Sequence, residues 1–189
     1  MSKKIILGGI FFCFLIGSLG AIIGIKVYKK IWEKENNITK NYYDTENKVA
    51  VSPATLRKMI DDKKTDFVLV DLRSKEEYNA EHIIGAINIP AVTMNEDQIV
   101  SEFKKISIDK EIIVHCYSAY CMLGKQVGQV LANKGIYVKD LNIGWSEWKY
   151  YWGLWNPGED PKVGLKYLEK GTGNTKTVPG VCTNGKFGC

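Results

Sequence analysis

The feature that most constrains the fold is an alternation that begins near residue 49, in which short apolar runs are each followed by an amphipathic stretch. The pairs are Val49–Val51 with Pro53–Ile60, Phe67–Val70 with Lys75–Tyr78, Ala86–Ile89 with Asp97–Phe103, Ile112–Val114 with Cys121–Lys134, and Val138–Ile143 with Trp145–Trp152. Strand followed by helix, repeated along a chain, is typical of α/β domains with a mostly parallel sheet. We therefore predict one α/β domain over residues 49–157.

The fourth amphipathic stretch gives the clearest helix pattern. Its apolar residues recur at helical spacing along one face, namely Leu123, Val127, Val130 and Leu131. Gly124 and Gly128 lie one turn apart on this helix, which would allow it to approach the sheet closely. Gly135 is a suitable C-cap, and Ser52 with Pro53 is a suitable start for the first helix.

Composition excludes several classes of protein. A chain of 189 residues with 45% hydrophobic residues is long and apolar enough for one globular domain, so wholesale disorder is ruled out. Five cysteines are too few for a disulfide scaffold, and two histidines without a Cys-x-x-Cys pair argue against a structural zinc site. The net charge of +5 arises partly beside an apolar segment, so it is weak evidence for nucleic-acid binding, which we do not predict. No metal or organic cofactor is implied.

The N-terminal residues from Ile5 to Ile25 contain no charged side chain. As a helix this run spans about 31 Å, the thickness of a bilayer core. We predict an uncleaved transmembrane anchor over residues 1–30; the alternative is a signal peptide cleaved near Ser18-Leu19-Gly20. The polar residues 31–48 are interpreted as a linker or as a helical extension of the anchor.

Two sequence signals disagree on which side of the membrane the domain lies. Lysines at 26, 29 and 30 follow the apolar run, and the positive-inside rule would place the domain in the cytoplasm. Lys3 and Lys4 before the run resemble the start of a secretory signal, and the cysteine pair in the tail suits an oxidising compartment. We predict an extracytoplasmic domain, periplasmic or at the cell surface, with the cytoplasmic side as the alternative.

A cysteine directly after a buried-strand pattern is the main candidate for chemistry. Cys116 follows the apolar run Ile112–Val114 and precedes the amphipathic helix. Unpaired N–H groups and the helix dipole at such a position stabilise a thiolate, and ligands of α/β folds bind at the carboxyl ends of strands. The alternative is an inert buried cysteine.

Residues 49–157 resemble a single rhodanese-type sulfurtransferase domain. The resemblance rests on Val70-Asp71-Leu72-Arg73, Glu77-Tyr78, His82-Ile83, Gly85 to Pro90, Cys116 at the family's persulfide-forming position, and Gly144 with Trp148. It implies a rhodanese-like three-layer sandwich with a mostly parallel five-stranded sheet. It also implies that the Cys116 thiolate takes a sulfane sulfur from thiosulfate, a polysulfide or a protein persulfide. The resulting persulfide would be stabilised by the N–H groups of Tyr117, Ser118, Ala119, Tyr120, Cys121 and Met122, and would be discharged by a thiol or another thiophile.

The loop departs from the family pattern at two positions. The family often has Gly at the fourth loop position and Arg or Lys at the sixth, where this chain has Ala119 and Cys121. Without the cation, thiosulfate loses a natural partner for its negative end. Lys125, one turn further along the helix, would compensate only if it pointed to the loop.

Cys121 opens a second possibility. If it met Cys116, it could attack the persulfide, release sulfide and leave a disulfide, so that the protein acts as a dithiol redox protein. If it faced the buried side of the helix, the two thiols would not meet. A third interpretation is a non-catalytic docking module on the same fold.

Other residues of the signature are interpreted as structural. Asp71 and Arg73 would fix the loops at the end of a strand, and His82 would bridge a turn. The aromatic cluster at 145–155 would cover the sheet or, alternatively, contact a membrane interface. We expect residues 158–189 to form a loop-rich tail in which Cys182 and Cys189 pair under oxidising conditions. The oligomeric state is not predicted.

Overall fold

The computed structural model describes the backbone of residues 3–171 and the side chains of residues 20, 21 and 23–171. The chain divides into two units, residues 1–47 and 48–189. The first unit is helical: α1 runs from Lys3 to Val49 and includes the predicted linker at 31–48. Among the described residues, no helix is both long and apolar enough to cross a membrane. Most side chains of the run from Ile5 to Ile25 lie outside those described, so the anchor over residues 1–30 stays a prediction.

The second unit contains the five-stranded parallel sheet expected from the sequence. Its strands lie in the order β1-β6-β5-β2-β4. Their bounds are Ala50–Val51 (β1), Phe67–Asp71 (β2), Ile87–Asn88 (β4), Glu111–His115 (β5) and Lys139–Leu141 (β6). Strand β5 is central, and its last residue, His115, lies beside Asp71 of β2. The residues that follow β5 and β2 therefore emerge at the same edge of the sheet.

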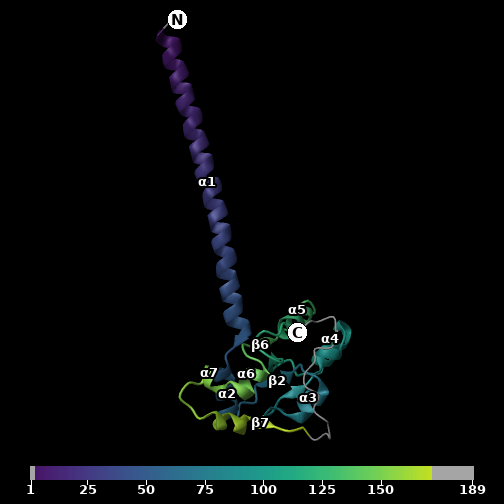
Figure 1. Ribbon diagram of the computed structural model, residues 1–189. Helices are drawn as coiled ribbons and strands as arrows, with labels where there is room; N and C mark the ends of the chain where they lie inside the picture. Colours follow the sequence, from purple (N-terminus) through teal and green to yellow (C-terminus); the bar gives the residue numbers. More distant parts are fainter. Residues whose placement is uncertain (1–2, 172–189) are drawn as a thin grey trace. The chain divides into compact units, whose positions relative to one another are not determined.

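Helices cover both faces of this sheet. The described helices of this unit are α2 (Pro53–Asp61), α3 (Lys75–Ala80), α4 (Glu96–Phe103), α5 (Leu123–Ala132), α6 (Trp145–Tyr150) and α7 (Trp152–Trp155), with 3-10 turns η1 (Ala91–Thr93) and η2 (Pro161–Tyr167). Figure 1 shows α2, α6 and α7 grouped on one side of the sheet, and α4 and α5 on the other. Because side chains alternate along a strand, Ile113 joins the core under α2, α6 and α7, whereas Ile112 and Val114 join the core under α4 and α5. The result is the expected three-layer arrangement.

The predicted start of the first helix and the apolar stripe of the fourth are found in the structure, whereas α5 ends at Ala132 with Asn133 as its C-cap, and Gly135, at φ 75°, lies two residues beyond this cap. The Ser52 hydroxyl accepts the Thr55 N–H at 3.1 Å and caps α2, with Pro53 in its first turn. On α5, Leu123, Val127 and Leu131 are buried, while Val130 is half-buried. A Cβ on Gly124 would lie 2.4 Å from Asp140 Oδ1 on β6, so this glycine does allow the helix to approach the sheet closely.

The segment after residue 157 is not a loose tail as far as Gly171. Strand β7 (Leu168–Glu169) pairs antiparallel with β3 (His82–Ile83). Tyr167 is 1% exposed and donates a hydrogen bond to Asp61 at 2.8 Å. The expectation of a tail over 158–189 is therefore wrong for residues 158–171, which complete the core on the α2 side. Residues 172–189, with Cys182 and Cys189, lie outside the described residues.

Candidate active site

Cys116 lies directly beyond the carboxyl end of β5, at the start of the loop that leads into α5. Its side chain is 5% exposed. Two main-chain bonds from α6 hold this loop: Trp145 N–H donates to the Cys116 carbonyl and Ser146 N–H to the Tyr117 carbonyl, both at 2.9 Å. The fold therefore gives the thiol a fixed position at the edge of the sheet where α/β domains bind their ligands.

The second thiol of the loop meets the first. The Cys121 N–H donates to the Ser118 carbonyl at 3.0 Å, which closes a tight turn. This turn brings the two sulfur atoms of Cys116 and Cys121 to 2.6 Å. Both cysteines are free thiols, Cys116 buried and Cys121 half-buried. The interpretation in which Cys121 never meets Cys116 is therefore wrong.

The hydrogen bond between the two thiols shifts their pKa values in opposite directions, because one thiol donates the proton and the other accepts it. The hydrogen bond from Cys116 lowers the pKa of Cys121 to about 6, and the backbone N–H groups of Leu123 and Tyr117 assist. The hydrogen bond to Cys121 and burial raise the pKa of Cys116. At neutral pH the negative charge accordingly rests on Cys121, and the proton on Cys116.

The main-chain N–H groups of the loop do not form the full cradle expected from residues 117–122. Ala119 N–H donates to Glu147 Oε2 at 3.0 Å, Tyr120 N–H to Ser118 Oγ at 3.3 Å, and Cys121 N–H to the Ser118 carbonyl. The Tyr117 N–H lowers the pKa of both Cys116 and Cys121. The negative charge on Cys121 is therefore stabilised mainly by the hydrogen bond from Cys116, with the N–H groups of Leu123 and Tyr117 contributing less.

Glu147 is a positioning residue that sequence reasoning missed. Its Oε2 accepts the N–H of Ala119 at 3.0 Å and that of Gly144 at 2.9 Å, which ties the cysteine loop to the start of α6. The available signal was its spacing: a glutamate three residues after Gly144 is typical of a helix capping box.

The surroundings of the loop are acidic. The Tyr117 hydroxyl donates a hydrogen bond to Glu77 Oε2 at 2.6 Å. Burial is the main cause that raises the pKa of Tyr117, and this hydrogen bond is the second. Glu147 bonds the loop as above, and the charge of Asp140 opposes ionisation of Cys121. In the described part of the chain, no lysine or arginine donates a hydrogen bond to residues 116–122. Lys125 is exposed on α5, Tyr120 is 90% exposed, and Met122 is 50% exposed.

Asp71 and Arg73 are buried and support the same edge of the sheet. Arg73 Nη2 lies 2.6 Å from Asp71 Oδ2, and its guanidinium stacks 4.2 Å from the centre of the Trp145 ring. Burial opposes ionisation of Asp71, but the interactions with His115 and Arg73 outweigh burial and hold the pKa of Asp71 below its usual value. Burial lowers the pKa of His115, so its ring is neutral at pH 7. The positive charge beside Asp71 is then that of Arg73.

His82 bridges a turn to the C-terminal segment. Its ring stacks on Tyr78, with Nδ1 2.7 Å from the Tyr78 carbonyl and Nε2 3.2 Å from Glu169 Oε1. The structure places no part of it at the cysteine loop. In the aromatic cluster at 145–155, Trp145, Trp148 and Trp152 are buried in the core on the α2 side, as expected for a helix face that covers the sheet, while Tyr150 and Tyr151 are exposed.

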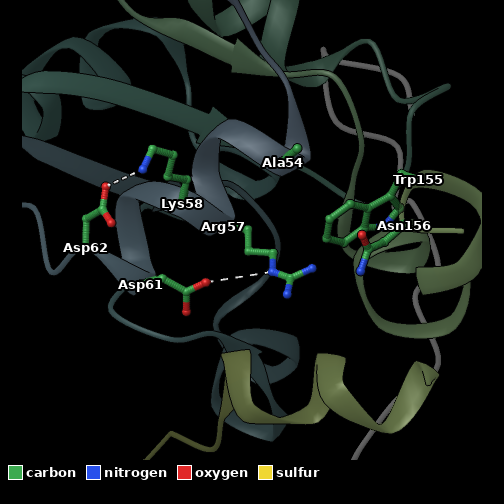
Figure 2. A pocket seen from close by; sticks show the side chains of 7 residues that line it. All are labelled: Ala54, Arg57, Lys58, Asp61, Asp62, Trp155 and Asn156. Carbon is green, nitrogen blue, oxygen red and sulfur yellow. Dashed lines mark ion pairs between the residues drawn. The ribbon is translucent and has the colours of Figure 1, made fainter. Parts of the chain in front are cut away.

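A separate pocket of about 380 Å³ lies between α2 and residues 155–156. None of its lining residues belongs to the cysteine loop. Figure 2 shows its charged groups paired with each other, Lys58 with Asp62 and Arg57 with Asp61, so it offers no unpaired charge to a ligand. Within the described residues, no group of three or more His, Cys, Asp or Glu side chains could hold a metal ion.

These observations define the class of protein. It is an α/β domain with a parallel sheet and a cysteine in the loop that follows the central strand. The model of the family "Rhodanese-like domain" matches residues 52–150, and the chain belongs to this family.

Relatives in sequence and solved structures also match this part of the chain. Over 88 residues the chain is 30% identical to thiosulfate sulfurtransferase GlpE of Coxiella burnetii, covering 46% of this chain and 76% of that enzyme. Over 84 residues it is 34% identical to the HTH-type transcriptional regulator Rv0324 of Mycobacterium tuberculosis, covering 44% of this chain but only 35% of that protein. The BH2092 protein from Bacillus halodurans matches with a TM-score of 0.52 at 28% identity, covering 61% of this chain and 82% of that one.

Proposed function

We propose that this domain transfers sulfane sulfur through a persulfide on Cys116 to a thiol acceptor. The observation that carries the proposal is the thiol pair at the carboxyl end of β5, with Cys116 held by α6 and Cys121 in direct contact with it. Cys121 takes the proton of Cys116 along their hydrogen bond. The Cys116 thiolate then attacks the outer sulfur of the donor, forms a new S–S bond and expels the donor's thiolate.

The donor that fits this loop is a persulfide or a polysulfide. Thiosulfate carries two negative charges, and its sulfonate end needs a cation. Glu77 and Glu147 bond to the loop instead, and the sixth loop position carries a thiol. A monoanionic persulfide, presented by a protein or by a small thiol, meets less repulsion than thiosulfate. GlpE is named a thiosulfate sulfurtransferase, so the two proteins would differ in donor.

The domain would act at a membrane surface. This part of the proposal rests on the uncharged run from Ile5 to Ile25 and on the lysines at either end of it. We place the domain on the extracytoplasmic side. A reporter fused after Cys189, active in only one compartment, tests this placement, and activity on the cytoplasmic side would reverse it.

The test of sulfur transfer uses the full chain, reduced and then exposed briefly to glutathione persulfide or to thiosulfate. With the persulfide donor, mass analysis of wild-type peptides should find either one added sulfur atom on Cys116 or a disulfide at Cys116 formed as that sulfur leaves as sulfide; a thiol reverses both. The Cys116→Ser variant should gain none while keeping its circular dichroism spectrum. If wild type neither gains sulfur nor releases sulfide beyond what Cys116→Ser does, the proposal is overturned and the docking module is favoured.

A further inference from the structure

We infer that Cys121 is a resolving thiol, which attacks the Cys116 persulfide, expels sulfide and closes a disulfide between Cys116 and Cys121. The inference rests on the proposed function, because it starts from the Cys116 persulfide. It adds a second activity, the reduction of sulfane sulfur to sulfide at the expense of the two loop thiols.

The distance between the sulfurs is the first support. At 2.6 Å, Cys121 Sγ is closer to Cys116 Sγ than a van der Waals contact and only slightly further than the about 2.05 Å of a disulfide bond. In the persulfide, Cys116 Sγ is the inner sulfur, the atom that an attacking thiolate must reach. The turn closed by the Ser118 carbonyl already holds Cys121 beside that atom.

Space near Cys116 is the second support. The outer sulfur of a persulfide lies about 2 Å from the inner one. In the direction of Cys121 that position is already occupied, so the outer sulfur points away from Cys121. This is the in-line arrangement in which attack of Cys121 on the inner sulfur expels the outer one. Neither sulfur has another thiol in contact within the described residues.

The ionisation of the pair is the third support. A resolving thiol reacts as its thiolate, and the pKa of Cys121 is lowered to about 6, mainly by the hydrogen bond from Cys116. The backbone N–H groups of Leu123 and Tyr117 also lower it, and they do not depend on the Cys116 proton. Cys121 therefore keeps a source of charge stabilisation after Cys116 has accepted sulfur.

The resolving step exchanges one S–S bond for another. The Cys121 thiolate forms a bond to the inner sulfur, the bond between inner and outer sulfur breaks, and the outer sulfur leaves as hydrosulfide with the electron pair. The two cysteine sulfurs are oxidised and the sulfane sulfur is reduced. A dithiol, or two equivalents of a monothiol, then reduces the disulfide and restores the pair.

The test is a single turnover on the full chain with glutathione persulfide, whose leaving group is glutathione, so that sulfide arises only from the second step. Wild type should release close to one sulfide per chain above the protein-free background and yield a linked pair of peptides containing Cys116 and Cys121. The Cys121→Ser variant lacks the group that takes the Cys116 proton, so it should load more slowly; after longer exposure it should release only the background and retain one extra sulfur on Cys116. Cys182→Ser with Cys189→Ser is the matched control and should behave as wild type.

The outcomes separate the two proposals. If wild type and Cys121→Ser both retain sulfur on Cys116 and neither forms the disulfide, the resolving role is overturned and the sulfur transfer stands. If Cys116 takes up no sulfur in any variant and no disulfide forms, sulfur transfer itself has failed. Cys121→Ala, without any hydroxyl, repeats the test if the serine variant folds poorly.

Discussion

Gly144 lies directly against the backbone of Ser118. A Cβ built on Gly144 would fall 2.2 Å from the Ser118 amide nitrogen and 2.3 Å from its Cα. Because both atoms are backbone atoms, no side-chain rotation can relieve the contact. The start of α6 is therefore the surface on which the cysteine loop rests, and only a residue without a side chain fits there.

Replacing Gly144 by Ala should displace this loop. We expect destabilisation of about 3 kcal/mol or more, at the upper end of overpacking effects, and loss of sulfur uptake by Cys116. Urea denaturation and peptide mass analysis measure the two effects. Gly153→Ala is the control: a Cβ there meets nothing within 4 Å, so stability should be equal or higher. Wild-type loading in Gly144→Ala would show that the contact is dispensable.

The reactivity of Cys121 should follow its lowered pKa. The thiolate is the reactive form, so alkylation by iodoacetamide, mapped to Cys121, should be fast at neutral pH and fall as the pH drops through about 6. Removing the donor thiol with Cys116→Ala should move the midpoint upward, towards that of an ordinary cysteine. An unchanged midpoint in that variant would mean that the hydrogen bond from Cys116 does not set the acidity.

Adding a cation to the loop should change the preferred donor. Cys121→Arg places a guanidinium at the sixth loop position, where a charge-assisted hydrogen bond of about 1.5–3 kcal/mol can form with thiosulfate. The ratio of thiosulfate to persulfide use should rise about tenfold or more relative to Cys121→Gln, which also lacks the thiol but is neutral. Equal ratios in the two variants would mean that the missing cation does not limit thiosulfate.

The segment after residue 157 should contribute strongly to stability. Tyr167 stacks on Trp152 and bonds Asp61 and Arg57, so Tyr167→Ala should cost about 3–5 kcal/mol and Tyr167→Phe about 1–3 kcal/mol. Thermal and urea unfolding measure both. Leu165→Ala, at a side chain 58% exposed, is the control and should change stability by less than about 0.5 kcal/mol. A stable Tyr167→Ala protein would contradict the packing described here.

The parallel sheet was predictable because its signals are local and repeated. The five apolar runs became the five strands, and the stripe of Leu123, Val127 and Leu131 faces the core. The pair β3–β7 was not predictable in the same way, since two residues carry no period and their partners are far apart in sequence. Gly164 was equally hard to interpret from the sequence. A glycine in such a segment is typical of a loop, yet this one packs directly against the Trp152 ring.

The position of the proposed nucleophile was predictable, but its surroundings were not. A strand followed by a cysteine and a helix is sufficient to place Cys116. Whether Cys121 meets Cys116 depends on a turn of the loop, closed by the Ser118 carbonyl, that the spacing alone does not determine. The acidic contacts of Glu77 and Glu147 depend likewise on tertiary packing.

The sheet ends at each side in a strand of only two residues, β1 and β4. An open sheet edge presents unpaired backbone groups to which another chain can add, and very short edge strands limit such pairing. On the membrane surface proposed above, copies of this domain would meet at high local concentration. With edges this short, crowding should not drive them to join their sheets into aggregates.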